Sequence, residues 1–179
     1  MSMSVHFSSP RDNVLQMGLR EGMRVGDFGT GTGHYAQAAA DIVGDEGRVY
    51  AVDIHQDILD HMVRSAERRY IGCIRPTWGD IDKVGGTHLH DASLDAVMLA
   101  NVLFQISDRD ALAQEIRRVL VPGGKLLVVD WSGSYGGIGP ASRNVVPAPA
   151  AEAFFIEQGF HKVKSFRAGP HHYGILFTV

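Results

Sequence analysis

Apolar runs alternate along the chain with longer segments in which apolar residues recur at helical spacing. The runs predict buried strands at 23–28, 48–52, 71–76, 94–100 and 125–131. The helical spacing predicts helices at 9–19, 33–43, 56–69, 107–121 and 147–158. Strands that alternate with helices in this way form a largely parallel sheet with helices packed on it.

Local signals predict where some of these helices begin and end. Ser9 and Pro10 are typical of a cap followed by the first helical position. Ser107 and Asp110 have the spacing of a capping box, which predicts a helix that starts at Ser107. The same helix is expected to stop at Pro122-Gly123-Gly124.

Two further strands, 161–166 and 173–179, are separated by a short turn at Ala168-Gly169-Pro170, which predicts an antiparallel hairpin. The predicted fold is therefore α/β, with one doubly wound seven-stranded sheet that is mostly parallel and ends in an antiparallel hairpin. We expect residues 1–179 to form a single domain. Within it, 1–20 form an N-terminal helical cover and 132–146 a flexible loop over the substrate.

The composition of the chain mainly excludes certain classes of protein. The 179 residues are 45% hydrophobic and 21% charged, which is ordinary for a globular domain. The net charge of −3 creates no overall basic field for nucleic acid or an anionic membrane. The chain has one cysteine, Cys73, and no apolar run approaching the roughly 20 residues of a membrane helix. The N-terminus does not resemble a secretory signal, so we expect a cytoplasmic protein.

The stretch VGDFGTGTGH, residues 25–34, holds three glycines between a predicted strand and a predicted helix. Such a turn presents backbone N–H groups at the carboxyl edge of a parallel sheet, where ligands bind. A dinucleotide site requires Gly-x-Gly-x-x-Gly, and His34 stands where the third glycine should be. A phosphate-binding P-loop is excluded because no Gly-Lys-Ser/Thr follows.

Asp27 also argues against a phosphate ligand. It lies two residues before Gly29, where its carboxylate would repel a pyrophosphate. A ligand with positive character and no phosphate would tolerate that charge.

VGDFGTGTG resembles the first motif of class I S-adenosylmethionine-dependent methyltransferases, in which an acid precedes Gly-x-Gly-x-Gly. Gly26 departs from the motif, since the family commonly has a bulky apolar residue there. Four later stretches resemble further motifs in the family's order: VYAVDI at 49–54, WGDI at 78–81, LDAVMLAN at 94–101 and LVPGGKL at 120–126. The resemblance covers roughly residues 20 to 131 and implies methyl transfer from S-adenosylmethionine.

The resemblance also implies which residues bind this cofactor. Asp53 would accept hydrogen bonds from the ribose hydroxyls, although nicotinamide enzymes use an acid in the same way. Asp80 would accept one from the adenine amino group, and Asp27 would either contact the ligand or only the backbone of the turn. The full set of expected cofactor-binding residues is Asp27, Phe28, Gly29, Thr30, Gly31, Gly33, Asp53, Ile54, Gly79, Asp80, Ile81 and Asn101.

Methyl transfer from a sulfonium is an in-line displacement that needs alignment, and a general base only where the acceptor is protonated. The catalytic candidates are Asn101 and Asp130, at the ends of the fourth and fifth strands. Asn101 is not followed by the Pro-Pro-aromatic sequence of adenine- and amide-nitrogen methyltransferases.

The remaining expectations concern metals and partners. The histidines at 88, 90, 171 and 172 lack a third ligand at a recognisable spacing, so we expect no metal. The expected acceptor is a small molecule, because the core fold occupies almost the whole chain. A protein or RNA acceptor, or a cofactor-binding module or partner subunit without its own turnover, is the alternative. A homodimer is compatible with the sequence.

Overall fold

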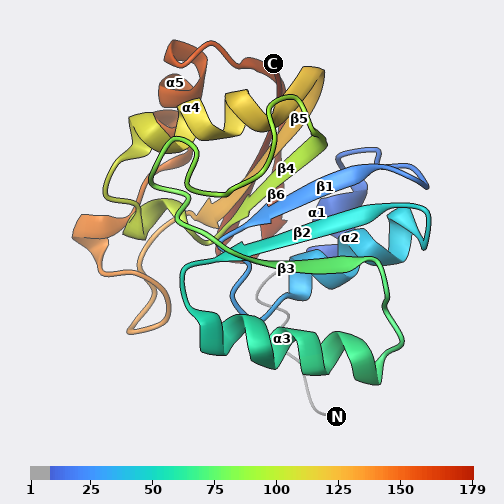
Figure 1. The fold of residues 1–179 in the computed structure, drawn as a ribbon. Helices are drawn as coiled ribbons and strands as arrows, with labels where there is room; N and C mark the ends of the chain where they lie inside the picture. Colours follow the sequence, from blue (N-terminus) through green and yellow to red (C-terminus); the bar gives the residue numbers. More distant parts are fainter. Residues whose placement is uncertain (1–8) are drawn as a thin grey trace.

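The computed structural model describes residues 9–179, which form one seven-stranded sheet with the strand order β3-β2-β1-β4-β5-β7-β6 (Figure 1). The strands are β1 (Arg24–Phe28), β2 (Arg48–Asp53), β3 (Ile74–Trp78), β4 (Leu94–Ala100), β5 (Leu120–Trp131), β6 (His161–Gly169) and β7 (His172–Thr178). The helices are α1 (Pro10–Leu15), α2 (His34–Val43), α3 (Gln56–Arg68), α4 (Arg109–Val119) and α5 (Ala148–Glu157), with short 3-10 turns at Leu103–Gln105 and Ser142–Asn144. Strand β7 pairs antiparallel with β5 and β6, and the other pairs are parallel. The predicted fold is confirmed.

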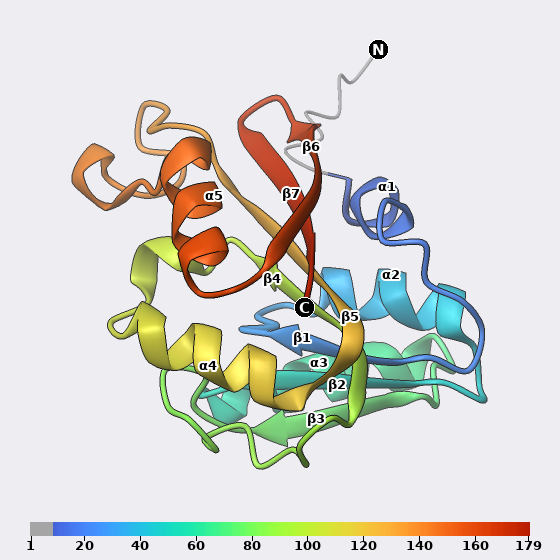
Figure 2. The same ribbon diagram turned by 90° about the horizontal axis from the view of Figure 1, so that it is seen from above.

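Helices cover both faces of the sheet. Figure 2 shows α4 and α5 on one side of the sheet and α1 and α2 on the other. Strand β4 serves both layers, because Ala96 and Met98 pack in one apolar cluster while Val97 and Leu99 pack in the other. Burial on both faces explains why β4 is an apolar run without polar alternation.

The order of the strands reverses between β1 and β4. The chain moves outward from β1 through β2 to β3, then crosses to β4 and continues in the opposite direction. The carboxyl ends of β1 and β4 therefore flank a crevice at this switch point, which is where open α/β folds bind ligands.

The limits predicted for two of the helices, α1 and α4, are wrong. Helix α1 ends at Leu15, not Leu19. Helix α4 is capped by Asp108, whose carboxylate accepts a hydrogen bond from the Ala111 N–H at 2.9 Å. Ser107 instead donates its backbone N–H to Asp82 Oδ2 at 2.9 Å. A carboxylate one residue further on thus takes the capping role predicted for Ser107.

Three predicted strand limits also change. Helix α4 already ends at Val119, and Pro122-Gly123-Gly124 lies inside β5, at an irregularity between the pairs Leu94–Leu120 and Ala96–Lys125. Strand β3 is shifted to Ile74–Trp78 and runs along the edge of the sheet, where Pro76 is tolerated. Strand β6 continues to Gly169, which shortens the predicted turn of the hairpin.

The predicted N-terminal cover, 1–20, is described only from residue 9 onward, so residues 1–8 of that prediction lie outside the described residues. Within residues 9–179, no helix has both the length and the apolar character needed to cross a membrane.

Candidate active site

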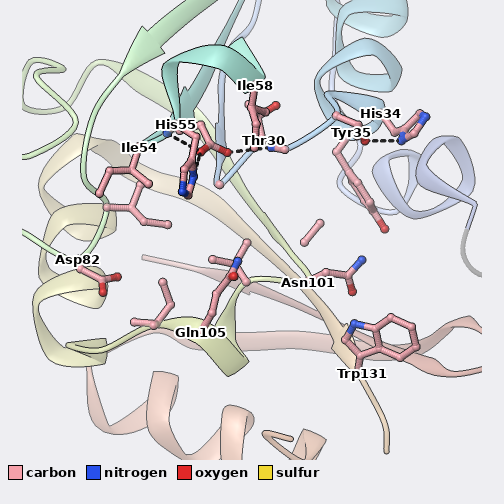
Figure 3. Close-up of a pocket in the computed structure, with 18 of the residues that line it drawn as sticks. Thr30, His34, Tyr35, Ile54, His55, Ile58, Asp82, Asn101, Gln105 and Trp131 are labelled. Atoms are coloured by element: carbon pink, nitrogen blue, oxygen red, sulfur yellow. Dashed lines mark hydrogen bonds and ion pairs between the residues drawn. The ribbon is translucent and has the colours of Figure 1, made fainter. Parts of the chain in front are cut away.

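A cavity of about 770 Å³ lies at the carboxyl ends of the central strands. Figure 3 shows Ile54, His55 and Asp82 toward one end of it and Tyr35, Asn101 and Trp131 toward the other. Its walls come from the glycine turn, the loops after β2, β3 and β4, the first turns of α1, α2 and α3, the end of β5 with the following loop, and the start of β7. They are formed by Pro10, Gly29, Thr30, Gly31, Thr32, His34, Tyr35, Asp53, Ile54, His55, Ile58, Gly79, Asp80, Ile81, Asp82, Ala100, Asn101, Val102, Gln105, Ile106, Trp131, Ile138, Gly139 and His172.

The glycines of the turn are required by the backbone. Gly29, Gly31 and Gly33 have φ angles of +74°, +51° and +79°, which side chains rarely tolerate. A Cβ at Gly29 would lie only 2.8 Å from Val102 Cγ2, whereas one at Gly31 would meet nothing within 4 Å. Gly31 therefore leaves the backbone exposed to the cavity, and Gly33, which does not line the cavity, begins α2.

Asp27 lies behind this turn. It is 1% exposed, does not line the cavity, and accepts a hydrogen bond from Thr30 Oγ1 at 2.6 Å. Burial raises its pKa to about 6, although the Thr30 hydroxyl acts in the opposite direction. This hydrogen bond is to a side chain of the turn, whereas the two contacts expected for Asp27 were with the ligand or with the backbone of the turn. Phe28 is likewise fully buried.

Asp53 joins two of the cavity walls. Its Oδ2 atom accepts a hydrogen bond from the Gly31 N–H at 3.0 Å, and Oδ1 accepts one from the His55 N–H at 3.0 Å. His55 Nδ1 lies 3.2 Å from the same Oδ1. The carboxylate at the end of β2 thus holds the glycine turn after β1, and each of its oxygens retains lone pairs for a ligand.

The loop after β3 supplies Gly79, Asp80 and Ile81, as predicted for the cavity wall. Asp80 forms an ion pair with Lys83 at 2.9 Å, and this contact lowers its pKa. Asp82 also lines the cavity, although no sequence motif predicted it. Its Oδ1 atom is buried and has no hydrogen-bond partner within residues 9–179.

The two catalytic candidates, Asn101 and Asp130, differ in their position relative to the cavity. Asn101 lines the cavity with a left-handed backbone, φ +59°. Asp130 is 1% exposed and does not line it. The Asp130 carboxylate accepts hydrogen bonds from the Leu103 N–H at 2.9 Å and the Trp131 N–H at 2.7 Å, and burial raises its pKa to about 6. It therefore supports the loop that carries Asn101.

Several residues of the cavity wall belong to none of the sequence motifs. Tyr35, Ile58, Gln105, Ile106, Ile138 and His172 come from five different segments of the chain. No spacing rule connects them, because only the folded sheet brings their segments together. Within the described part of the chain, no group of three or more His, Cys, Asp or Glu side chains is placed to hold a metal ion.

The chain is similar to known proteins in both sequence and fold. A family model described as a methyltransferase domain matches residues 19–163. The chain belongs to the methyltransferase domain family. The match extends beyond the five motifs, because it runs through α5 into β6.

Curated relatives of this methyltransferase domain include two C-methyltransferases of ubiquinone and menaquinone biosynthesis, both named UbiE. The protein from Shewanella woodyi is 31% identical over 133 residues, which is 74% of this chain and 52% of the relative. The protein from Haemophilus ducreyi is 31% identical over 136 residues, which is 74% of this chain and 50% of the relative. The chain thus spans about half the length of the curated relatives that it matches.

Solved structures share the fold. A SAM-dependent methyltransferase from Aquifex aeolicus superimposes with a TM-score of 0.88 at 22% identity, over 97% of this chain and 90% of that one. The [4+2]-cyclase SpnF gives a TM-score of 0.79 at 18% identity, over 94% of this chain and 78% of that one. Because the second is titled a cyclase, likeness of fold alone does not specify the reaction.

Proposed function

We propose that this methyltransferase domain transfers a methyl group from S-adenosylmethionine to a small-molecule acceptor. The observation that carries the proposal is the buried Asp53 carboxylate at the cavity wall, hydrogen-bonded to the Gly31 N–H of the glycine turn at 3.0 Å. The family match supports the same reaction.

The residues present fit this cofactor. The open backbone at Gly31 admits a ligand close to the main chain, and Asp53 can accept hydrogen bonds from ribose hydroxyls. Asp80, with Gly79 and Ile81 beside it, is available to the adenine amino group at the end of the cavity formed by the β3 loop. Within residues 9–179, no lysine or arginine lines the cavity, which suits a ligand without phosphate.

When bound, S-adenosylmethionine supplies an electrophilic methyl group, which leaves the sulfonium sulfur as its bond to the acceptor forms, so that a thioether remains and the acceptor loses a proton. The protein's own contribution is alignment. Asp53 and the glycine turn would fix the cofactor, and the aromatic residues at the other end of the cavity would orient the acceptor. Asp130 accepts hydrogen bonds from the Leu103 N–H after β4 and from the Trp131 N–H at the end of β5, so it joins these two segments and acts as a positioning residue.

Titration calorimetry with S-adenosylmethionine, S-adenosylhomocysteine and NAD tests this assignment. We expect both sulfur nucleosides to bind at micromolar concentrations and NAD not to bind at the same concentrations. Formation of S-adenosylhomocysteine with a panel of acceptors then measures turnover. Failure of both nucleosides to bind at millimolar concentration would overturn the cofactor assignment, and tight binding with no turnover on any acceptor would favour a binding module.

A further inference from the structure

The end of the cavity away from Asp53 and Asp80 has an aromatic wall with a fixed orientation. The Trp131 ring packs against the His172 ring, with centroids 4.3 Å apart and planes at 44°. A Cβ at Gly139 would lie 2.7 Å from Trp131 Cδ2, so the loop backbone lies directly against the indole. Strand β7 and the 132–146 loop therefore hold Trp131 in place.

Tyr35 contributes a second aromatic surface from the first turn of α2. Its side chain is largely buried, and its hydroxyl accepts a hydrogen bond from Asn13 Nδ2 of α1 at 2.9 Å. In Figure 3, Asn101 lies between Tyr35 and Trp131. Rigid aromatic walls of this kind favour a planar, apolar ring system.

The charges around the cavity restrict the ligand further. Asp53, Asp80 and Asp82 line it, and Asp80 is paired with Lys83, but within residues 9–179 no lysine or arginine lines the cavity itself. An anionic acceptor would lose its hydration without gaining a counter-ion. A cationic acceptor would be repelled by the sulfonium that the proposed function places in the same cavity.

Asn101 offers the polar contact at this end. Its backbone is held left-handed, φ +59°, with its N–H donated to the Val129 carbonyl at 2.8 Å. Its Oδ1 atom is buried and has no hydrogen-bond partner among residues 9–179. Rotation about the terminal torsion of an asparagine is soft, so the carboxamide can present either its oxygen or its NH₂ to a ligand. A hydroxyl, which both donates and accepts, matches that group.

We propose that the methyl acceptor is an uncharged, planar aromatic molecule bearing a hydroxyl or amino group, which lies between Tyr35 and Trp131 and hydrogen-bonds the Asn101 carboxamide. This inference rests on the proposed function, because it places the acceptor beside the cofactor in one cavity. It assigns Asn101, which the family resemblance places among the cofactor-binding residues, to positioning the acceptor instead.

The indole N–H resonances of protein labelled with ¹⁵N-tryptophan report on this end of the cavity. The chain has two tryptophans, Trp78 and Trp131, and the Trp78→Phe variant assigns the two signals. Calorimetry first establishes saturation with S-adenosylhomocysteine, and three probes with one ring system are then titrated: naphthol, naphthoate and naphthylmethylammonium. We expect naphthol to shift the Trp131 signal saturably and to bind at least about ten-fold more tightly than either charged probe.

Asn101→Gly tests the carboxamide without adding backbone strain, because glycine suits the positive φ. We expect naphthol to bind about ten-fold more weakly and S-adenosylhomocysteine to bind as it does to the unmodified chain. Ala92→Gly, at another left-handed residue (φ +47°) outside the cavity wall, is the matched control and should change neither affinity.

The outcomes separate this inference from the proposed function. If S-adenosylhomocysteine does not bind, the proposed function fails, and the inference with it. If it binds but naphthol does not shift Trp131, or a charged probe binds as tightly as naphthol, the acceptor class is wrong. If Asn101→Gly weakens S-adenosylhomocysteine as much as naphthol, Asn101 serves the cofactor and the assignment is overturned.

Discussion

The Gly31 N–H donates a hydrogen bond to Asp53 Oδ2 at 3.0 Å, and this contact joins the turn after β1 to the end of β2. The two residues are 22 positions apart in the chain, and they come together because β1, which precedes the turn, and β2 are adjacent parallel strands. The same carboxylate therefore shapes the turn and faces the cavity, so its role can be tested through both binding and stability.

Asp53→Ala should weaken the affinity for S-adenosylhomocysteine by roughly 10-fold or more, because charge-assisted hydrogen bonds to the ligand are lost. Calorimetry measures the affinity, and thermal unfolding measures the accompanying loss of the Gly31 contact. Asp60→Ala, which removes an exposed carboxylate of α3, is the matched control. Equal affinities in the two variants would refute a ribose-binding role for Asp53.

Gly29→Ala should destabilise the fold more than Gly22→Ala does. Both positions have positive φ, +74° and +83°, so each alanine incurs roughly 1–2 kcal/mol of backbone strain. Only at Gly29 would the new methyl meet Val102, at 2.8 Å, while Gly22 has nothing within 4 Å. Denaturant unfolding measures the difference, and Val102→Ala in the Gly29→Ala background should recover part of it. Equal losses at the two glycines would show that Val102 moves aside at no cost.

The affinity for S-adenosylmethionine should fall, relative to that for S-adenosylhomocysteine, as the pH is lowered from 7.5 to 5. Asp27, whose pKa is raised to about 6 by burial, gains a proton over this range, and its negative charge behind the turn is lost. Loss of this negative charge weakens the attraction of the positively charged sulfonium of S-adenosylmethionine. It does not affect the neutral thioether of S-adenosylhomocysteine. Calorimetry of both ligands at several pH values measures the ratio.

Asp27→Asn provides the control for that pH effect, since the amide oxygen can still accept from Thr30 and carries no charge. The part of the pH dependence due to Asp27 should disappear in this variant, while any part due to Asp130, whose pKa burial also raises to about 6, should remain. An unchanged pH dependence would show that the Asp27 charge does not reach the ligand.

Glu115 should make the protein acid-sensitive. This buried carboxylate of α4 accepts hydrogen bonds from Arg118 Nε and Nη2, each at 2.8 Å, and from the Gly85 N–H at 2.6 Å. Burial acts to raise its pKa, but the bonds from Arg118 and Thr87 outweigh it and lower the pKa from 4.5 to about 2. A depressed folded-state pKa stabilises the fold above pH 4.5, by roughly 3 kcal/mol, and that stability is lost as the pH falls toward 2.

Chemical denaturation between pH 7 and pH 3 measures this effect. In Glu115→Gln the free energy of unfolding should be lower at pH 7 and should fall less steeply below pH 4.5. Glu157→Gln replaces an exposed carboxylate of α5. Its free energy of unfolding should fall at low pH as steeply as that of the parent protein. If the free energy of unfolding of Glu115→Gln and that of the parent protein fell in parallel as the pH is lowered, Glu115 would not be the group responsible.

The glycine turn and its partner acid were predictable because their signals are local. Three glycines within five residues demand a left-handed backbone, and the end of the next strand is near in sequence. Helix limits were less predictable where two adjacent residues compete. Ser107 and Asp108 can both cap α4, and the Asp82 carboxylate, 25 residues away, engages the Ser107 N–H.

The alternation of strands and helices, the glycine turn and the acids at the strand ends follow from the amino-acid sequence, because hydrophobic period and turn chemistry act over a few residues. Which side of β5 faces the cavity was decided only by the tertiary structure. Asp130 and Trp131 are neighbours in a strand, so they point to opposite sides, and the pairing of β5 with β4 and β7 puts Trp131 in the wall and Asp130 behind it. Tyr35, Asn101 and Trp131 line one cavity because long-range pairing of strands places their segments at one edge of the sheet.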